Sequence, residues 1–241
     1  MAGVSTARPT VSVIVPAYRE APNLRRLTER AFAALDQAGL DAEVVIVDDD
    51  SQDGSVEIVE ELASRFPVRI VVRTDRRGLS SAVLRGFEEA AGEVFVVMDA
   101  DLQHPPDKIP ELADCITSGR ADFAVGSRYT GRGSTDRDWP LLRRLNSRVA
   151  TLLARPLTQV RDPMSGFFAL HRDTWRRAIR LDPIGYKIGL ELIVKARCRR
   201  CLEVPITFAD RAAGQSKLTF AEQLRYLRHL LRLYRFRLLS R

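Results

Sequence analysis

Short apolar runs in the first half of the chain alternate with segments whose apolar residues recur at helical spacing. The apolar runs predict buried strands at 11–15, 44–47, 68–72, 94–98 and 123–125. Between the runs, residues such as Leu24, Leu27 and Leu35 recur every three or four positions, which predicts amphipathic helices. This alternation predicts an α/β fold in which helices cover both faces of a mostly parallel sheet.

Beyond about residue 130 the pattern is less regular. We expect a helix over 139–154, a turn-rich segment entering a short strand at 161–170, a helix over 188–198, a strand at 204–208 and a polar loop at 211–217. The chain then closes with one long helix. The sequence therefore predicts an irregular second part after the alternating one.

The C-terminal helix is strongly amphipathic. Its apolar residues repeat at spacings of three and four along one stripe, and arginines follow the same rhythm one residue later. The stripe contains Phe220, Leu224, Leu227, Leu231, Tyr234 and Leu238, the arginines are Arg225, Arg228, Arg232 and Arg235, and further leucines stand at 230, 233 and 239. The pattern fits either a helix packed on the domain with its arginines in water or a helix lying in a membrane interface.

Charge is unevenly placed in the chain of 241 residues, whose net charge is +7. Residues 217–241 hold seven basic residues and one acidic residue, a balance of +6, so the main body is nearly neutral. This distribution argues against nucleic acid as a partner, because a nucleic-acid-binding domain has a broad basic face. Length and a hydrophobic content of 45% suit one α/β domain with an extension.

The sequence carries neither a signal-peptide pattern nor a run of about 20 apolar residues, so we expect a cytoplasmic protein or one attached to a membrane from that side. Three cysteines, Cys115, Cys198 and Cys201, do not make a disulfide framework. The lone Cys198-x-x-Cys201 pair is typical of incidental cysteines near a helix end.

The most informative chemical signal follows the apolar run at 94–98. Asp99 and Asp101 come directly after it, and Gln103 continues the same spacing of two. Ligands of α/β sheets collect beyond the carboxyl ends of strands, and residues two apart on an extended segment point the same way. Carboxylate oxygens suit Mg²⁺ or Mn²⁺, which keep a phosphate as a further ligand. We therefore predict a metal site that holds a diphosphate.

Other strands end in polar residues at the same predicted edge. Tyr18 could stack on a base, and Glu20 or Asp49 could accept hydrogen bonds from a base or ribose. The neighbouring Asp50, Ser51 and Asp53 are typical of a turn and a helix start. Arg128 follows the run at 123–125, and Arg211 and Lys217 flank a glycine in a polar loop, an arrangement that suits phosphate oxygens. Dinucleotide-binding and P-loop glycine patterns do not occur in the sequence.

A set of motifs occurs in the order found in one family: V-I-V-P-A-Y-R-E, V-D-D-D-S-Q-D-G, M-D-A-D-L-Q-H-P-P, G-S-R-Y, R-D-P-M-S-G-F-F-A-L, G-Y-K, E-V-P-I-T-F and R-A-A-G-Q-S-K-L. From Val11 to Leu218 the chain resembles the dolichol-phosphate (polyprenyl-phosphate) mannose synthases, inverting glycosyltransferases of family 2 with the GT-A fold. The resemblance implies a GT-A catalytic domain over 1–218, with a nucleotide half at about 10–130 and an acceptor half at about 131–218. The helix at 219–241 follows it.

The resemblance also implies roles for single residues. The guanosine site would be lined by Pro16, Tyr18, Glu20, Val47 and Asp49. The metal would be bound by Asp99, Asp101 and Gln103, with Ala100 touching the nucleotide. The diphosphate, the sugar and the incoming lipid phosphate would be handled by Arg128, Arg211 and Lys217, which with Asp101 form the catalytic set. Ser165 would lie near the acceptor phosphate.

The implied reaction moves mannose from GDP-mannose to a polyprenyl or dolichyl phosphate with inversion, with Mg²⁺ or Mn²⁺ as cofactor. Two alternatives stay open: a relative that uses a UDP-sugar, and a non-catalytic nucleotide-sugar-binding membrane scaffold. Many relatives add transmembrane helices, whereas this sequence ends in one amphipathic helix. We therefore favour the interfacial interpretation of that helix and a peripheral location on the cytoplasmic membrane face, and it stays open whether a separate membrane subunit helps to hold the lipid.

Overall fold

A computed structural model describes residues 9–75, 77–131, 149–185, 187–207 and 220–239. Its centre is a seven-stranded sheet in the order β3-β2-β1-β4-β6-β5-β7. The strands are β1 Val11–Ala17, β2 Ala42–Asp48, β3 Val68–Val72, β4 Val94–Val97, β5 Phe123–Ser127, β6 Phe168–His171 and β7 Cys201–Pro205. All are parallel except β6, which runs antiparallel to β4 and β5. The predicted mostly parallel sheet is confirmed.

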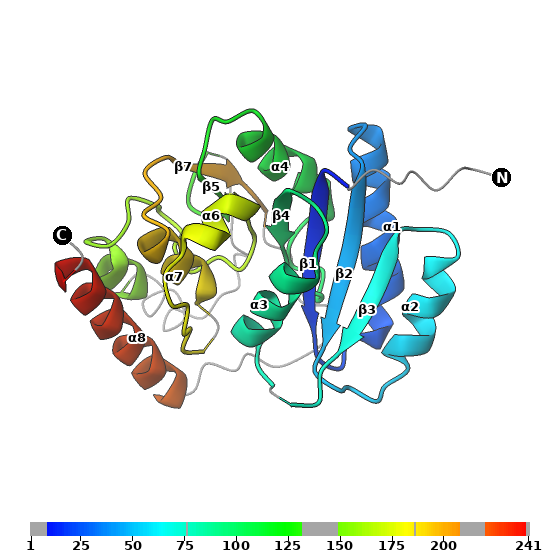
Figure 1. Ribbon diagram of the computed structural model, residues 1–241, viewed down its shortest axis with the longest axis horizontal. Helices are drawn as coiled ribbons and strands as arrows, with labels where there is room; N and C mark the ends of the chain where they lie inside the picture. Colours follow the sequence, from blue (N-terminus) through cyan, green and yellow to red (C-terminus); the bar gives the residue numbers. More distant parts are fainter. Residues whose placement is uncertain (1–8, 76, 132–148, 186, 208–219, 240–241) are drawn as a thin grey trace.

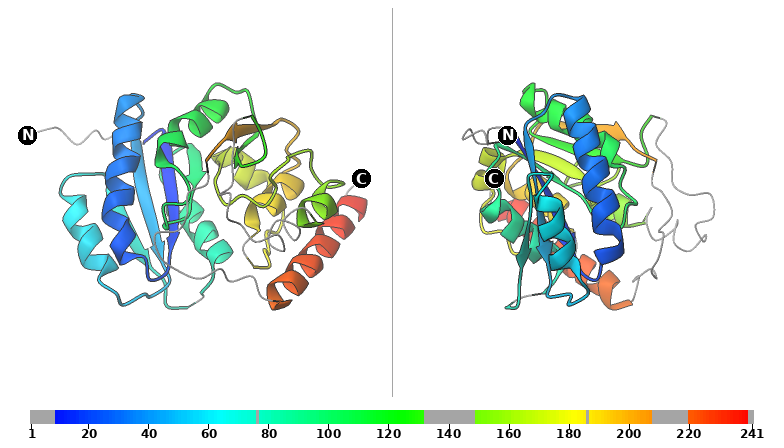
Figure 2. Two further views of the ribbon diagram at one scale, coloured as in Figure 1. Left: turned by 180° about the vertical axis from the view of Figure 1, so that it is seen from behind. Right: turned by 90° about the vertical axis from the view of Figure 1, so that its right-hand side faces the viewer.

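Helices cover both faces of the sheet (Figures 1 and 2). They are α1 Ala21–Gln37, α2 Ser55–Ala63, α3 Leu79–Glu89, the 3₁₀ turn η1 Pro106–Lys108, α4 Ile109–Thr117, α6 Arg172–Arg177, α7 Ile188–Lys195 and α8 Phe220–Leu239. Residues 149–154 are also helical. The rest of the helix expected over 139–154 lies outside the described residues.

Two apolar clusters form because successive strand residues point to opposite faces. Val13 and Val15 of β1 pack with α1, α2 and α4, whereas Ile14 between them packs with Val83 and Phe87 of α3. The second cluster also takes in Ile188 and Leu192 of α7. The helical stripes predicted after the first four strands are therefore the buried faces of α1 to α4.

The second half differs from the sequence prediction in three details. The short strand at 168–171 is antiparallel, the helix α6 was not predicted, and β7 begins at Cys201 and ends at Pro205 instead of spanning 204–208. β7 lies at the sheet edge, where a proline is tolerated, and Pro205 has no N–H to donate to a ladder.

The helix α8 lies at the end of the molecule and packs on α7 (Figure 1). Leu230 and Leu233 are buried in a third cluster with Leu190 and Val194 of α7. Among the described residues, no helix has both the length and the apolar character needed to cross a membrane.

Candidate functional site

Parallel pairing brings several predicted site residues to one sheet edge. Ala17 at the end of β1 pairs with Asp48 at the end of β2, and β4 runs beside β1 in the same direction. Tyr18 and Asp49 directly follow β1 and β2, and Asp99 follows β4 after Met98. Among the predicted lining residues, Pro16 and Val47 are partners in the β1–β2 register.

The segment after β4 presents two partly exposed carboxylates. The Asp99 side chain is 32% exposed, and Asp101 is intermediate in burial. Asp101 Oδ1 accepts a hydrogen bond of 3.1 Å from the Gln103 amide across Leu102, whose φ of 60° is left-handed. Ala100 and Gln103 are buried. The hydrogen bond from the Gln103 amide to Asp101 therefore holds these two residues in a tight turn just after Asp99.

The buried side chain of His104 holds the Asp99 backbone through a hydrogen bond. Its ring is 2% exposed and stacks on Phe167 with ring centroids 5.2 Å apart. His104 Nδ1 accepts a hydrogen bond of 3.0 Å from the Asp99 amide. Burial lowers the pKa of His104 to about 4, against opposing charges such as Asp101, so the imidazole is neutral at neutral pH. Because Nδ1 accepts, its proton lies on Nε2.

A glycine of the D-P-M-S-G-F segment faces the Asp99 carboxylate. A Cβ at Gly166 would lie 3.4 Å from both carboxylate oxygens of Asp99 and from His104 Cε1. A Cβ there would be in van der Waals contact with the Asp99 carboxylate. The preceding Ser165 uses its hydroxyl locally, accepting a hydrogen bond of 3.2 Å from the Phe167 amide.

Arg128 is fixed by a buried partner that the sequence did not point to. Asp162 accepts hydrogen bonds from Arg128 Nε at 2.7 Å, Nη2 at 2.8 Å and the backbone amide at 3.1 Å. The Asp162 side chain is 0% exposed. Burial alone would lower the pKa of Arg128, but the hydrogen bonds and charge of Asp162, with smaller effects from Tyr129 and Asp99, raise it. Arg128 therefore stays charged, and the charge of Asp99 is one of the effects that raise its pKa.

Asp49 also has an arginine partner that we did not predict. Arg73, the first residue after β3, donates from Nη2 to Asp49 Oδ1, and the Gly78 amide donates to Asp49 Oδ2 at 2.7 Å. The two side chains are only 4% and 9% exposed. Asp49 thus anchors the loop that enters α3. A search for cations directly after strands would have found Arg73.

Tyr18 lies at the surface of the protein, just after β1. Its side chain is 39% exposed, and the guanidinium carbons of Arg19 and Arg77 lie 5.3 Å and 5.6 Å from its ring centre. Arg77 also pairs with Asp50 at 3.4 Å. Glu20 accepts a hydrogen bond of 2.6 Å from Asn23 at the start of α1.

Of Asp50, Ser51 and Asp53, predicted to form a turn and a helix start, Ser51 and Asp53 make turn hydrogen bonds, whereas the N-cap positions of α1 and α2 belong to Glu20 and Gly54. Asp53 accepts hydrogen bonds from the Ala21 amide at 3.1 Å and from the Ser55 amide at 3.2 Å, the first residues of α1 and α2. Ser51 accepts from the Arg19 amide at 2.8 Å and donates to Asp48 at 2.5 Å. Arg211 and Lys217 lie outside the described residues.

The donor set at Asp99 suits a hard divalent cation. No three His, Cys, Asp or Glu residues of the described chain are grouped to hold a metal by themselves. Two partly exposed carboxylates and the neutral oxygen of Gln103 fit Mg²⁺ or Mn²⁺, which take oxygen ligands and complete their shell with water and phosphate. Gly166 places no side chain against the Asp99 carboxylate, which a Cβ there would contact at 3.4 Å.

Comparison with known proteins gives concordant matches. A family model described as glycosyl transferase family 2 matches residues 12–177. The chain is 47% identical to a dolichol-phosphate mannosyltransferase from Pyrococcus furiosus, over 94% of this chain and 64% of that protein. It is 48% identical to a protein of the same name from Mycosarcoma maydis, over 97% of this chain and 82% of that protein. The chain thus spans less than two thirds of the length of the archaeal relative.

A solved structure also resembles it. A mannosyltransferase from Pyrobaculum calidifontis in complex with GDP-Man and Mn²⁺ has a TM-score of 0.57 and 21% identity, over 95% of this chain and 64% of that one. This likeness shows that the two chains share a fold.

Proposed function

Because this chain belongs to glycosyl transferase family 2, we propose that it transfers mannose from GDP-mannose to a polyprenyl or dolichyl phosphate, forming a β-linked lipid phosphomannose. The observation that carries the proposal is the identity of 47% and 48% to two dolichol-phosphate mannosyltransferases over nearly the whole chain. These relatives confirm the resemblance recognised in the sequence motifs. The site geometry supports the same chemistry.

The proposed donor site occupies the shared edge of β1, β2 and β4. Tyr18, Glu20 and Asp49 would receive the nucleoside, and Asp99, Asp101 and Gln103 would hold Mg²⁺ or Mn²⁺ beside the diphosphate. A divalent cation supplies charge neutralisation for the leaving nucleoside diphosphate. Arg128 adds a cation whose orientation is fixed by Asp162, so little reorganisation is needed as charge develops.

The acceptor explains why a general base is not needed. A lipid phosphate oxygen is already anionic at neutral pH and can attack the anomeric carbon directly, while the bond to the nucleoside diphosphate breaks. Attack opposite the leaving group converts an α-linked donor into a β-linked product. His104 is buried and already bonded to the Asp99 amide through Nδ1, so we assign it a positioning role.

A turnover assay tests the donor and the metal. Labelled GDP-mannose and UDP-glucose are each offered with a short polyprenyl phosphate and Mg²⁺ or Mn²⁺. We expect mannose transfer from GDP-mannose, and we expect EDTA or Asp101→Ala to lower turnover by roughly a hundredfold or more, since metal charge stabilisation is worth several kcal/mol. Asp114→Ala is the matched control, because that carboxylate is 61% exposed and pairs with Arg120 away from the site.

Each other outcome selects an alternative. Preferred turnover of UDP-glucose would assign the UDP-sugar donor. Full activity in EDTA would remove the metal from the mechanism. Tight nucleotide-sugar binding without turnover of either donor would favour the non-catalytic scaffold.

We also propose that α8 lies on a membrane surface, where the lipid acceptor is found. The helix has two apolar faces: Leu230 and Leu233 are buried against α7, whereas Leu224, Leu231 and Leu238 are 61%, 70% and 69% exposed. The exposed leucines belong to the stripe predicted from sequence. The packed and the interfacial interpretations therefore apply to different faces of one helix.

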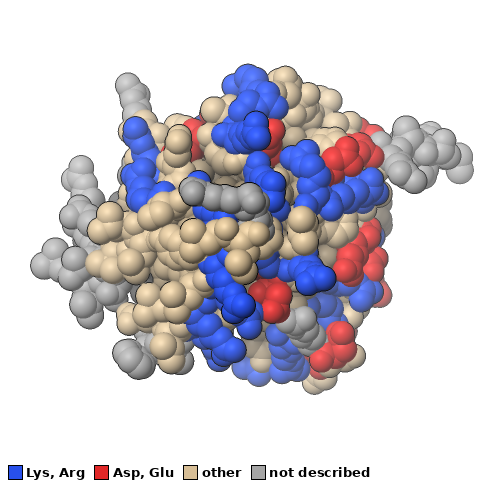
Figure 3. Space-filling view, turned by 60° about the vertical axis from the view of Figure 1, so that its left-hand side comes forward, with Lys and Arg blue, Asp and Glu red and all other residues tan. Residues whose placement is uncertain are grey.

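A second element packed beside α8 also exposes apolar side chains. Val149 and Leu152 of the helical segment at 149–154 are 47% and 70% exposed. Hydrogen bonds from the hydroxyls of Tyr226 and Tyr234 to backbone carbonyls of this segment hold it against α8. Arg228, Arg232 and Arg235 of α8 are exposed, and Figure 3 shows Lys and Arg side chains gathered on this side of the molecule beside uncharged surface.

This combination suits an anionic bilayer on the cytoplasmic side. Leucines would enter the acyl boundary, and each arginine near the headgroups contributes about 1 kcal/mol. The test is co-sedimentation with anionic and neutral liposomes for the full chain and for Leu227→Gln/Leu231→Gln. Leu202→Gln, an exposed leucine on the edge strand β7, is the control.

We expect the double variant to lose anionic-liposome binding and the control to keep it. Equal sedimentation of all forms would reject the interface. Binding that requires an added membrane protein would assign the lipid contact to a separate subunit.

A further inference from the structure

The G-Y-K motif ends at Lys187, the residue just before α7. Lys187 is half-buried, and its Nζ donates a hydrogen bond of 3.2 Å to the backbone carbonyl of Met164. Met164 belongs to the D-P-M-S-G-F segment, which also contains Asp162 and Gly166. The lysine therefore joins the start of α7 to the segment that contacts both Arg128 and Asp99.

Residues 162–165 of that segment form a closed turn, in which the Ser165 amide donates a hydrogen bond of 3.2 Å to the Asp162 carbonyl. At the start of the turn, the Asp162 side chain accepts two hydrogen bonds from the Arg128 guanidinium. Directly after the turn, a Cβ at Gly166 would lie 3.4 Å from both carboxylate oxygens of Asp99. The turn thus lies between the candidate phosphate-binding cation and the candidate metal ligand.

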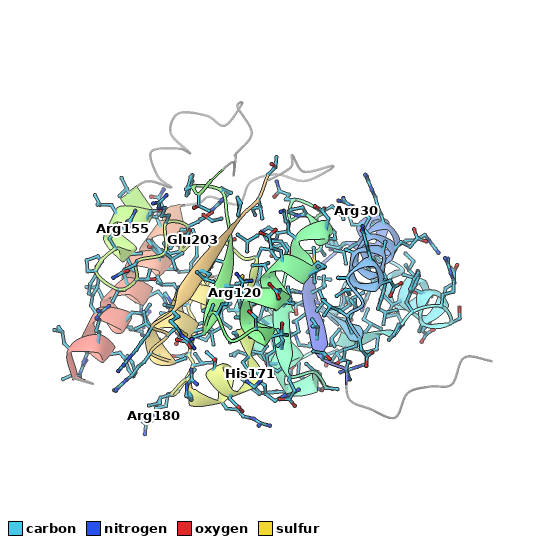
Figure 4. All side chains as sticks on the ribbon, turned by 90° about the horizontal axis from the view of Figure 1, so that it is seen from above. Arg30, Arg120, Arg155, His171, Arg180 and Glu203 are labelled. Carbon is cyan, nitrogen blue, oxygen red and sulfur yellow. The ribbon has the colours of Figure 1, made fainter. Side chains whose placement is uncertain are left out.

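Charged side chains from other elements hold this turn by its main chain. Glu203 of the edge strand β7 (Figure 4) accepts hydrogen bonds of 3.1 Å from the amides of Arg161 and Asp162, where the turn begins. Lys187 donates to the Met164 carbonyl, where the turn ends. Hydrogen bonds with an ionised partner are about twice as strong as those between neutral groups. Because the carboxylate contacts N–H groups and the ammonium contacts a carbonyl, each charge matches the peptide group that it binds.

The first turn of α7 also packs on the segment. A Cβ at Gly189 would lie 3.4 Å from the Phe168 ring and 3.7 Å from the Ser165 carbonyl oxygen, so the helix backbone approaches closely. The Met164 side chain packs against the apolar cluster that α7 and α8 share. These contacts fix the start of α7 beside the turn, and Lys187 is thereby placed within hydrogen-bond distance of the carbonyl that it binds.

We infer that Lys187 is a positioning residue for the acceptor side of the reaction, an inference that rests on the proposed function. By holding the Met164 carbonyl, the lysine fixes Ser165 and Gly166 beside Asp99, where the lipid phosphate would attack. The proposed nucleoside site lies at the ends of β1 and β2 and is held by other hydrogen bonds. Loss of the lysine should therefore impair use of the acceptor and leave GDP binding intact.

The first experiment measures the turn itself and needs no turnover. Hydrogen exchange of the full chain is followed by mass spectrometry in peptides that cover 161–167, where amides bond within the turn or to Glu203. In Lys187→Met we expect exchange there to be roughly tenfold faster, the value of one hydrogen bond to a charged group. Lys108→Met is the matched control, because that lysine donates to Glu111 at the start of α4. Unchanged exchange in Lys187→Met would overturn the inference.

The second experiment separates positioning from a purely structural role. With GDP-mannose saturating and a short polyprenyl phosphate varied, Lys187→Met should raise the KM for the acceptor by roughly tenfold. The Kd for GDP, measured by calorimetric titration, should stay at the wild-type value. Lys187→Arg keeps a charged donor and should bring the acceptor KM back to within a few-fold of the wild type. An unchanged KM in Lys187→Met, or a Kd for GDP that rises in step with it, would overturn the inference.

Urea unfolding of each variant shows that it is folded before it is assayed. Lys187→Gln, which keeps a polar side chain, replaces Lys187→Met in both experiments if the methionine variant does not fold. Failure of the proposed function and failure of the inference give different results. A wild-type chain that transfers no mannose rejects the proposed function. A wild-type chain that transfers mannose, with Lys187→Met equal to it in acceptor KM, rejects only the role of Lys187.

Discussion

Two buried arginine–aspartate pairs stand on either side of Asp99 and Asp101, and they differ in what they hold together. The Arg73–Asp49 pair joins residues 24 positions apart. Asp49 also accepts a hydrogen bond from the Gly78 amide, so the pair fixes the loop that enters α3. Arg128–Asp162 joins residues 34 positions apart through three hydrogen bonds.

The second pair belongs to a wider network. Glu203 of β7 accepts hydrogen bonds of 3.1 Å from the amides of Arg161 and Asp162. Asp162 therefore ties the end of β5, the D-P-M-S-G-F segment and β7 into one unit. The comparison teaches that the first pair shapes one loop, the one before α3, whereas the second joins three segments that are distant in the sequence.

The largest effect is expected for Asp162→Ala. The change leaves the Arg128 charge buried without its partner, which costs about 3–5 kcal/mol of unfolding free energy. Urea unfolding measures this loss. The double variant Arg128→Met/Asp162→Leu removes both charges and should recover much of the stability while staying inactive. An unstable double variant would mean that packing, rather than the unpaired charge, dominates.

A smaller effect is expected for Arg73→Gln. Asp49 keeps the hydrogen bond from Gly78, so unfolding free energy should fall by less than in Asp162→Ala. The loop before α3 should lose its fixed position, and the Kd for GDP should rise by about tenfold, the value of one hydrogen bond to a charged group. Calorimetric titration with GDP measures the Kd. Arg65→Gln, whose side chain is 61% exposed, should leave both quantities unchanged. An unaltered Kd in Arg73→Gln would limit the first pair to stability.

The smallest effect is expected at Asp53, which lies at the same edge but is held by backbone amides and Ser55. Asp53→Ala removes hydrogen bonds to the first residues of α1 and α2 and should cost about 1 kcal/mol. Burial alone would raise the pKa of Asp53, but the hydrogen bonds from Ser55 and Ala21 outweigh it and lower the pKa below 3.8.

The sign of the pH dependence follows from that shift. A carboxyl whose folded pKa is lowered contributes stability above its unfolded pKa of 3.8 and loses it as the pH falls through the folded pKa. The difference between wild type and Asp53→Ala should therefore be constant near neutrality and shrink below about pH 4. A difference that persists at lower pH would mean that the protonated side chain still accepts the hydrogen bonds of the Ala21 and Ser55 amides.

The strand ends were predictable because parallel strands place their carboxyl ends at one edge. This rule, together with the apolar runs, predicts that Tyr18, Asp49 and Asp99 lie at the same edge of the sheet. Arg73, the partner of Asp49, and Asp162, the partner of Arg128, could not be predicted in this way, because each pairing is long-range and neither residue forms a recognisable pattern. The sequence motif that contains Asp162 was recognised, but its meaning as a buried counter-charge needed the structure.

Several elements of the second half have weak local signals. β6 has four residues, and an apolar run of that length carries no information on strand direction. The helix α6, Arg-Asp-Thr-Trp-Arg-Arg, has no apolar stripe and begins where His171 accepts from the Asp173 amide. In α8 both sets of leucines fit helical spacing, so only packing against α7 decides that Leu230 and Leu233 are the buried pair.

The two apolar faces of α8 have a consequence for insertions and deletions. Consecutive residues of a helix are separated by about 100° around its axis, so Leu230 and Leu231 point to different surroundings. Losing a single residue in the middle of α8 would rotate every later side chain by that angle. If the lost residue precedes Leu233, Leu233 would leave α7 and Tyr234 would take its place. Point substitutions can alter one face at a time, but a change in the length of α8 disturbs both at once.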